Sequence, residues 1–202
     1  PTGRQRAHRT ILTAMRYIIG IIAILAVALG TSSCDNDEKT TWEEYAQWRE
    51  SNEAWLKEQQ ALKNPDGTPY YKVIVPDWNP GSFVLIHYFN DRSETEGNLS
   101  PLYTSTIDTR YTLYLYNDTR VDSSAYNTDP APGIFRTRLN NTVQGWAMAL
   151  TDMRCGDTAQ VVLPYGVAYG SQNLGDIPPY SNLRFNIRLV DIPYYEKPPY
   201  GK

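Results

Sequence analysis

Residues 143–170 read VQGWAMALTDMRCGDTAQVVLPYGVAYG, and residues 171–192 continue SQNLGDIPPYSNLRFNIRLVDI. Within this stretch, residues 183–192 alternate between apolar and polar side chains, which is the period of a strand with one buried face. Residues 158–163 are rich in apolar and β-branched residues and end at Pro164, which is also typical of a strand. We therefore expect two strands, separated by a loop that contains Ile177-Pro178-Pro179.

The same stretch carries an ordered series of motifs. It contains G-W-x-x-x-L-x-x-M-x-x-G, a strand that ends in Pro, A-Y-G, a short loop, I-P-P and L-x-F. In this order and at this spacing, the motifs resemble the C-terminal half of the FKBP-type peptidyl-prolyl isomerases. One triplet alone would carry little weight, but the complete series is specific. The residues concerned are Gly145, Trp146, Leu150, Met153, Gly156, Pro164, Ala168, Tyr169, Gly170, Ile177, Pro178, Pro179, Leu183 and Phe185.

The resemblance implies a fold and an activity. We expect an α+β domain over residues 70–193, in which a twisted antiparallel sheet wraps around a short helix that begins near Thr142. The implied activity is peptidyl-prolyl cis-trans isomerisation of Xaa-Pro bonds in exported proteins. This reaction rotates a C–N bond of partial double-bond character, so it needs no cofactor and no nucleophile. The expected partners are proline-containing polypeptides.

The resemblance extends upstream and supplies a candidate pocket. Arg110-Tyr111 is followed, eleven residues after Tyr111, by Asp122-Ser123-Ser124, and this pair of segments is similar to the family's H-Y-T-G and F-D-S-S. An apolar aromatic pocket suits the reaction because it excludes water and disfavours the charge-separated planar amide. The resemblance implies three catalytic residues, which are Tyr169 with its hydroxyl aimed at the substrate carbonyl, Asp122 at the rim and Trp146 as the floor. It implies as substrate-binding residues Tyr111, Val121, Phe135, Val143 through its backbone N–H, Trp146, Ile177 and Phe185.

Three departures separate this chain from the family pattern. Val121 stands where the family has Phe, so one aromatic wall is missing, and Leu113 and Asp118 replace two glycines. The loop between Tyr169 and Ile177 is one residue shorter than the common form and lacks its frequent His. These differences leave a second function open, because a fold does not by itself guarantee an activity. That alternative is a non-catalytic peptide-binding or chaperone lipoprotein with the same fold.

The beginning of the chain predicts export and attachment to a membrane. Residues 18–29 are almost wholly apolar, but they are shorter than a comfortable membrane span, which needs about 20 residues. They fit the apolar core of a secretory signal peptide that starts at Met15 and ends in small residues before Cys34. Thr-Ser-Ser-Cys resembles a loose bacterial lipobox, so we expect a lipid on Cys34. An uncleaved signal anchor, or a cleaved signal with a free Cys, is the alternative.

These features predict a lipoprotein of the outer membrane or cell surface of a Gram-negative bacterium. The acidic run at residues 35–38 resembles the export tag of some surface lipoproteins, although an ordinary solvated tether has the same composition. The expected organisation is a leader over residues 1–33, a tether over 34–40, a helix over 41–64, the domain over 70–193 and a tail over 194–202.

Residues 41–63 predict an amphipathic helix. Thr41-Trp42-Glu43-Glu44 has the form of a capping box, and Asn64-Pro65-Asp66-Gly67 ends the run. The apolar stripe consists of Trp48, Trp55 and Leu62 at intervals of seven, with Tyr45 and Ala54 beside them. We expect this stripe to pack on the domain, and a homodimer contact through residues 41–63 is the alternative.

The remaining segments predict further strands and exclude some chemistry. Strands are expected at residues 70–75, 83–89 and 107–116, with a polar insertion at 90–102 and an unpaired stretch from Pro193 to Lys202. The net charge of −3 shows no basic cluster of the kind that binds nucleic acid. With His87 in an apolar strand and no His/Cys/carboxylate cluster at metal spacing, neither a catalytic triad nor a metal site is expected. Cys155 is expected to be a buried, inert thiol.

Overall fold

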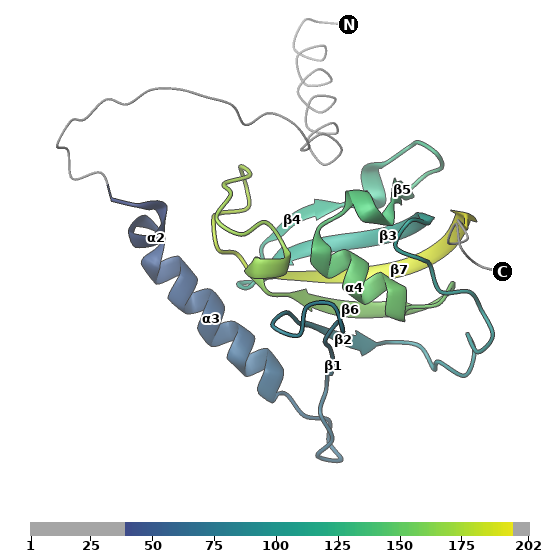
Figure 1. The fold of residues 1–202 in the computed structure, drawn as a ribbon, viewed down its shortest axis with the longest axis horizontal. Coiled ribbons are helices and arrows are strands. Elements are labelled where there is room, and N and C mark those ends of the chain that lie inside the picture. Colours follow the sequence, from purple (N-terminus) through teal and green to yellow (C-terminus); the bar gives the residue numbers. More distant parts are fainter. Residues whose placement is uncertain (1–38, 196–202) are drawn as a thin grey trace, which may run out of the picture. The chain divides into compact units, whose positions relative to one another are not determined.

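Seven strands form one sheet, and a single helix lies across one of its faces (Figure 1). The computed structural model describes residues 39–195, so Cys34 and the predicted leader lie outside the described residues. Neighbouring strands follow the order β1-β2-β6-β7-β3-β4, β5 pairs with β3, and every pairing is antiparallel. The strands are β1 (Lys72–Ile74), β2 (Val84–Tyr88), β3 (Thr106–Leu115), β4 (Arg120–Ser123), β5 (Phe135–Arg138), β6 (Thr158–Leu163) and β7 (Leu183–Tyr194).

The helices of the described residues fall into two groups. An N-terminal pair, α2 (Thr41–Glu44) and α3 (Ala46–Ala61), precedes the sheet, and α4 (Gln144–Asp152) packs on it. Three single turns of 3-10 helix lie in the connections, at Ser124–Tyr126, Leu139–Asn141 and Tyr165–Val167. This arrangement confirms the α+β architecture that the sequence predicts.

The long strands match the expected ones closely, whereas two short strands were not predicted. In β7 the alternating residues 183, 185, 187 and 189 are buried, as the sequence pattern indicates. Strands β4 and β5 have four residues each, too few to show a period of two. The expectation that Pro193 begins an unpaired tail is wrong, because β7 continues and Tyr194 pairs with Thr106. The register between β3 and β7 shifts at this end, where a strand tolerates the missing N–H of Pro193.

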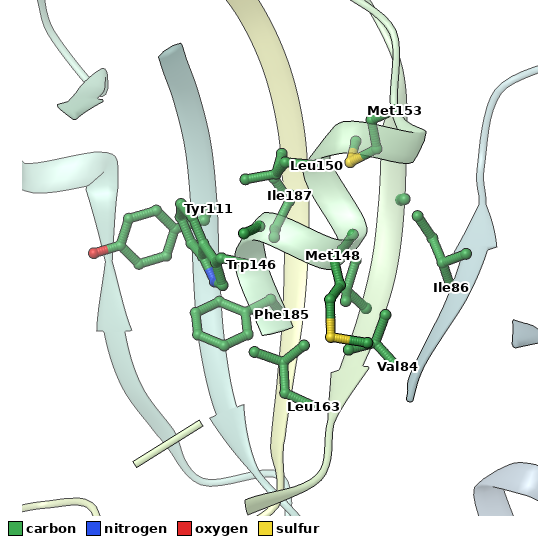
Figure 2. Packing of buried hydrophobic residues seen from close by; sticks show 14 of the residues in the cluster. Val84, Ile86, Tyr111, Trp146, Met148, Leu150, Met153, Leu163, Phe185 and Ile187 are labelled. Carbon is green, nitrogen blue, oxygen red and sulfur yellow. The ribbon is translucent and has the colours of Figure 1, made fainter. Parts of the chain in front are cut away.

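The main core lies between α4 and the sheet (Figure 2). Six consecutive residues of α4, from Gly145 to Leu150, are buried, so this helix is enclosed rather than amphipathic. Gly145 permits the close approach, since a Cβ there would lie 2.7 Å from Leu163 Cδ2 on β6. Figure 2 shows Met148, Leu150 and Met153 in contact with the aliphatic side of this core, while Trp146 joins the aromatic rings of Tyr111 and Phe185.

A second, smaller cluster of buried residues holds α3. It consists of Tyr71, Leu85 and Val162, with Trp55 and Leu56 of α3 packed against it. The helix therefore packs on its own domain, which is the interpretation that the sequence favoured.

The start of the N-terminal helix differs by one residue from the prediction. Thr40, rather than Thr41, is the cap, and it forms the capping box with Glu43 rather than Glu44. Both pairs have the required spacing of three residues, so the sequence alone does not separate the two registers. The helix also divides at Tyr45 and ends at Ala61, two residues before Lys63.

Only part of the predicted apolar stripe is buried, because Trp48 packs on the main core and Trp55 on the second cluster. Ala54 and Leu62 are exposed, and Leu62 lies beyond the last helical residue. The fully enclosed position is Asn52, and Arg49 is nearly as buried. Asn52 is buried because its partner, Asn182, lies on a distant loop, which a helical period does not reveal. Arg49 instead contacts Trp42 and Glu53 within the N-terminal helices.

The insertion at residues 90–102 is anchored to the domain by a buried carboxylate. Asp157 is fully buried and accepts hydrogen bonds from Thr95 Oγ1 at 2.6 Å and Asn90 Nδ2 at 3.1 Å. Arg92 lies 3.3 Å from the same carboxylate, and Cys155 N donates to Leu99 O. Both ends of the insertion are thus tied to the turn before β6.

Three single-residue expectations can be compared with the structure. Cys155 is half-buried rather than buried, and desolvation raises the pKa of its thiol, which keeps the reactive thiolate scarce. His87 stacks on Tyr70 with ring centroids 3.8 Å apart, a packing role. Asp118 stands where the family pattern has Gly. It has a φ of 64° and forms an ion pair with Arg184 at 2.7 Å. Between residues 39 and 195, no helix is long and apolar enough to cross a bilayer.

Candidate functional site

Four aromatic rings meet where the beginning of α4 faces β3, β5 and β7. Tyr111 lies edge-to-face with Phe135, Trp146 and Phe185, at centroid distances of 5.5, 5.3 and 6.0 Å. Trp146 also packs edge-on against Phe135 at 6.0 Å and Phe185 at 5.4 Å. Edge-to-face contacts are the preferred geometry of aromatic pairs, so the rings hold one another in place. We call these four residues the aromatic cup.

Three rings of the cup form a buried floor, and half-buried residues around them form a rim. Tyr111, Trp146 and Phe185 are 8, 4 and 3% exposed, so they cannot leave without opening the core. The rim consists of partly buried residues that pack against the same core, and all of them were predicted from the motifs: Val121, Phe135, Val143, Tyr169 and Ile177. Phe135 is brought into the cup because β5 pairs with β3.

A hydrogen bond between two predicted residues orders one side of the cup. Tyr111 donates its hydroxyl to Asp122 Oδ2 at 2.6 Å, across the β3–β4 pair. The other carboxylate oxygen accepts from the backbone N–H of Ser123 at 2.7 Å. Burial and then the Asp122 charge raise the pKa of the Tyr111 hydroxyl far above its usual range, so it remains a donor. Asp122 is thereby held at the rim with both oxygens engaged.

Two donors of the predicted site are available at the rim. Burial, followed by the charge of Asp122, raises the pKa of the Tyr169 hydroxyl, which therefore stays protonated at neutral and mildly alkaline pH. Val143 is the residue before α4, and its backbone N–H has no acceptor among residues 39–195. Orphan N–H groups of this kind are ordinary at a helix start and can donate a hydrogen bond to a ligand carbonyl oxygen.

The departures from the family pattern have different structural consequences. Leu113 is buried in the core and pairs with Phe185 of β7, so it fills space without affecting the rim. Val121 is half-buried at the rim, and its small side chain takes no part in the ring contacts. The site therefore keeps four rings and has no aromatic ring at Val121, a position that we call its open side.

Sequence reasoning missed the support of the rim loop, by which we mean residues 164–182 between β6 and β7. This loop carries Tyr169 and Ile177, and it is held from outside by polar contacts with α3. The residues that make those contacts are more than one hundred positions away in the sequence, so no local motif marks them. A shallow hollow at the other end of β3 and β7, lined by Thr106, Arg138, Pro193, Tyr194 and Tyr195, contains none of the cup residues.

The fold and the aromatic cup agree with the result of comparing the chain with known protein families. Residues 98–190 match the model of the FKBP-type peptidyl-prolyl cis-trans isomerase family. The chain therefore carries an FKBP-type peptidyl-prolyl cis-trans isomerase domain, and the matched range contains every residue of the predicted pocket.

Individual relatives agree with that assignment. The macrophage infectivity potentiator of Trypanosoma cruzi is 36% identical over 97 residues, which are 48% of this chain and 47% of that protein. FK506-binding protein 3 of Yarrowia lipolytica is 32% identical over 102 residues, which are 50% of this chain and 24% of that protein. The chain thus spans less than half the length of these curated relatives.

Solved structures support the fold. The crystal structure of FkpA from Escherichia coli has a TM-score of 0.58 at 21% identity, covering 76% of this chain and 64% of that one. A peptidyl-prolyl cis-trans isomerase from Pseudomonas syringae has a TM-score of 0.56 at 21% identity, covering 81% of this chain and 98% of that one. Both comparisons extend beyond the residues of the family match.

Proposed function

We propose that this protein is a peptidyl-prolyl cis-trans isomerase that acts on Xaa-Pro bonds of exported proteins. The observation that carries the proposal is the aromatic cup, four interlocking rings with a buried floor and a half-buried rim. A proline ring is compact and apolar, so an aromatic surface bordered by half-buried residues can hold it by contact while excluding water. The rim supplies the few polar groups that orient the peptide.

The reaction requires no nucleophile and no cofactor, only a lower barrier to rotation about one bond. The barrier to rotation is about 18–20 kcal/mol, and no covalent bond is broken. The planar amide is stabilised by charge separation, and a poorly solvated pocket favours the twisted state over the planar one. A thousandfold acceleration requires about 4 kcal/mol of differential stabilisation, which desolvation and two hydrogen bonds can supply.

The roles of the individual residues follow from their places. Trp146 at the start of α4 forms the floor on which the proline ring rests, and Tyr111 and Phe135 form walls. The Tyr169 hydroxyl and the Val143 N–H donate to carbonyl groups of the substrate. Asp122 fixes the Tyr111 ring through the 2.6 Å hydrogen bond and places a negative charge at the rim.

An exchange assay on a short Xaa-Pro peptide tests this proposal. We expect the purified protein to accelerate cis-trans interconversion, and we expect Trp146→Phe to reduce the rate while the domain stays folded. The open side at Val121 favours the second candidate, a non-catalytic peptide-binding protein on the same fold. Binding of the peptide without acceleration would establish that second function instead.

We further propose that the protein is a lipoprotein, attached to the outer membrane or cell surface of a Gram-negative bacterium through Cys34. The support is the apolar segment at residues 18–29 and the small residues that precede the cysteine. Cys34→Ala should abolish incorporation of a labelled fatty acid and move the protein to the soluble fraction. Retention of both the label and the membrane fraction would exclude Cys34 as the anchor.

A further inference from the structure

The rim loop has little regular structure to hold its shape. Within it the structure shows one turn of 3-10 helix, Tyr165–Val167, and one isolated bridge between Leu174 and Ile177. Turn hydrogen bonds within the loop, such as Gly170 N to Tyr165 O and Gln172 N to Tyr169 O, fix its local shape. The position of the whole loop relative to the cup depends also on its contacts with other elements.

A buried pair of asparagines fastens both ends of the rim loop to α3. Asn52 and Asn182 are both 0% exposed. Asn182 N donates to Asn52 Oδ1 at 2.8 Å, and Asn182 Nδ2 donates to Asn52 O at 2.6 Å. The remaining oxygen, Asn182 Oδ1, accepts from Tyr165 N at 2.8 Å, at the opposite end of the loop. Asn52 Nδ2 is in turn satisfied by Trp48 O at 2.9 Å.

A second chain of hydrogen bonds leads from α3 to the residue beside Ile177. Trp48 Nε1 donates to Ser181 Oγ at 3.0 Å, and Ser181 Oγ donates to Pro178 O at 2.7 Å. The helix thus contacts the loop at two consecutive residues, Ser181 and Asn182, shortly after the bend that carries Ile177. Figure 1 shows α3 alongside this loop, on the side of the sheet where β1 and β2 lie.

Ring contacts complete the attachment near Tyr169. Tyr180 has a φ of 61°, and its backbone N–H donates to Gly170 O at 2.7 Å. The Tyr180 ring packs edge-on against Trp42 of α2 at 5.3 Å and against Tyr165 at 5.6 Å. A left-handed backbone is unfavourable for tyrosine, so surrounding contacts must hold it, and α2 supplies one of them.

From these contacts we propose that α2–α3 positions the rim of the aromatic cup, with Asn52 as the positioning residue. Asn52 does not touch the substrate, and it acts through Asn182 on the loop that presents Tyr169 and Ile177. This inference rests on the proposed isomerase function for its effect on turnover. The coupling between helix and loop stands independently of that function.

The expected consequence concerns turnover more than substrate binding. Loss of the Asn52 side chain leaves the Asn182 N–H without its acceptor in a dry environment, so the loop must move to recover a partner. The floor of the cup belongs to β3, β7 and α4 and stays in place, so the proline ring still binds. A misplaced rim donor reduces the rate, and a displacement of about 1 Å can cost about a hundredfold.

The experiment compares Asn52→Ala with Leu56→Ala in the full chain. Leu56 lies one turn further along α3 and packs on the second cluster rather than on the rim loop, so its loss weakens docking without touching the loop. For Asn52→Ala we expect kcat to fall about tenfold or more with KM within about twofold, and faster amide exchange of residues 169–177. For Leu56→Ala we expect unchanged kcat and protected loop amides.

A conservative variant separates positioning from general stability. Asn52 donates to Trp48 O and accepts from Asn182 N. A protonated aspartic acid at this position can fill both roles, whereas an ionised carboxylate can accept from Asn182 N but cannot donate to Trp48 O. Burial raises the pKa of such a carboxyl, so Asn52→Asp should recover turnover as the pH is lowered toward 5, relative to the wild type at the same pH. The wild type should show no such recovery.

The outcomes separate this inference from the proposed function. If Asn52→Ala retains wild-type kcat and loop protection, or if Leu56→Ala reduces kcat as much, the positioning role is overturned. If Asn52→Ala does not fold, the pH dependence of Asn52→Asp tests the positioning role instead. Recovery of turnover toward pH 5 supports that role, and its absence overturns it. An inactive wild-type protein would refute the isomerase function, and amide exchange in the two variants would still decide whether Asn52 holds the loop.

Discussion

The aromatic cup and the seam between α3 and the rim loop are built on opposite principles. The cup consists of aromatic rings that contact one another edge-to-face, and all four lie within the residues that match the family model. The seam consists of fully buried polar atoms on Asn52 and Asn182, which are 130 residues apart. Ring contacts tolerate small shifts, whereas a buried hydrogen bond requires a narrow geometry. A buried donor or acceptor that loses its partner destabilises the folded state. We therefore expect the cup to supply affinity for the substrate and the seam to fix one position of the rim loop.

The largest expected effect is on the floor of the cup. Trp146→Ala should remove a buried ring and leave a cavity that cannot collapse, so the free energy of unfolding should fall by about 3–5 kcal/mol. Turnover on a proline peptide should be lost in whatever fraction remains folded. Urea unfolding measures the first effect. Trp78→Ala is the matched control, because Trp78 is 67% exposed and should change stability by less than about 0.5 kcal/mol.

The seam should be the next most sensitive place. Asn182→Ala removes the acceptor for Tyr165 N and the donor to Asn52 O, and each orphaned buried group costs about 1–3 kcal/mol. We expect a lower urea midpoint with an unchanged slope. Asn173→Ala in the same loop is the control, because Asn173 is exposed and its side-chain hydrogen bond to Tyr45 OH is 3.4 Å long. Equal effects of the two substitutions would show that the seam does not stabilise the fold.

Filling the open side of the cup should raise activity. Val121→Phe adds a ring beside the existing four, and an aromatic pair contributes about 0.5–1.5 kcal/mol beyond its buried area. We expect kcat/KM for a proline peptide to increase by about 2–10-fold, measured by exchange spectroscopy. Val190→Phe, at a partly exposed site on β7, should leave kcat/KM unchanged. A decrease with Val121→Phe would mean that the open side is needed by the substrate.

The smallest effect should come from the Tyr169 hydroxyl. Tyr169→Phe keeps the ring and deletes one donor worth about 0.5–1.5 kcal/mol, so kcat/KM should fall several-fold at most. Because burial and the Asp122 charge raise the pKa of this hydroxyl, the wild-type rate should stay level as the pH rises to about 10. An inflection below that pH would show that Tyr169 titrates earlier than its surroundings imply.

The sequence predicted features that depend on neighbouring residues and missed those that depend on contacts between distant ones. The strands at residues 158–163 and 183–192 were predicted because their apolar period is local, and the cup because its motifs occur in a fixed order. Thr40 and Thr41 offer the same cap spacing, so the choice between them depended on how the helix docks. Strands β4 and β5 were missed because four residues show no periodicity, and they exist because β3 is long enough to pair with both.

The sequence by itself determined the family, the antiparallel sheet, the central helix and the residues of the aromatic cup, because each depends on side-chain types at short and regular intervals. Only the tertiary structure decided the buried face of α3 and its attachment to the rim loop. Polar residues such as Asn52 are ordinarily exposed on a helix, and they become buried only where a distant partner satisfies every hydrogen bond. That condition depends on three-dimensional proximity, which the spacing of residues along a single chain does not encode.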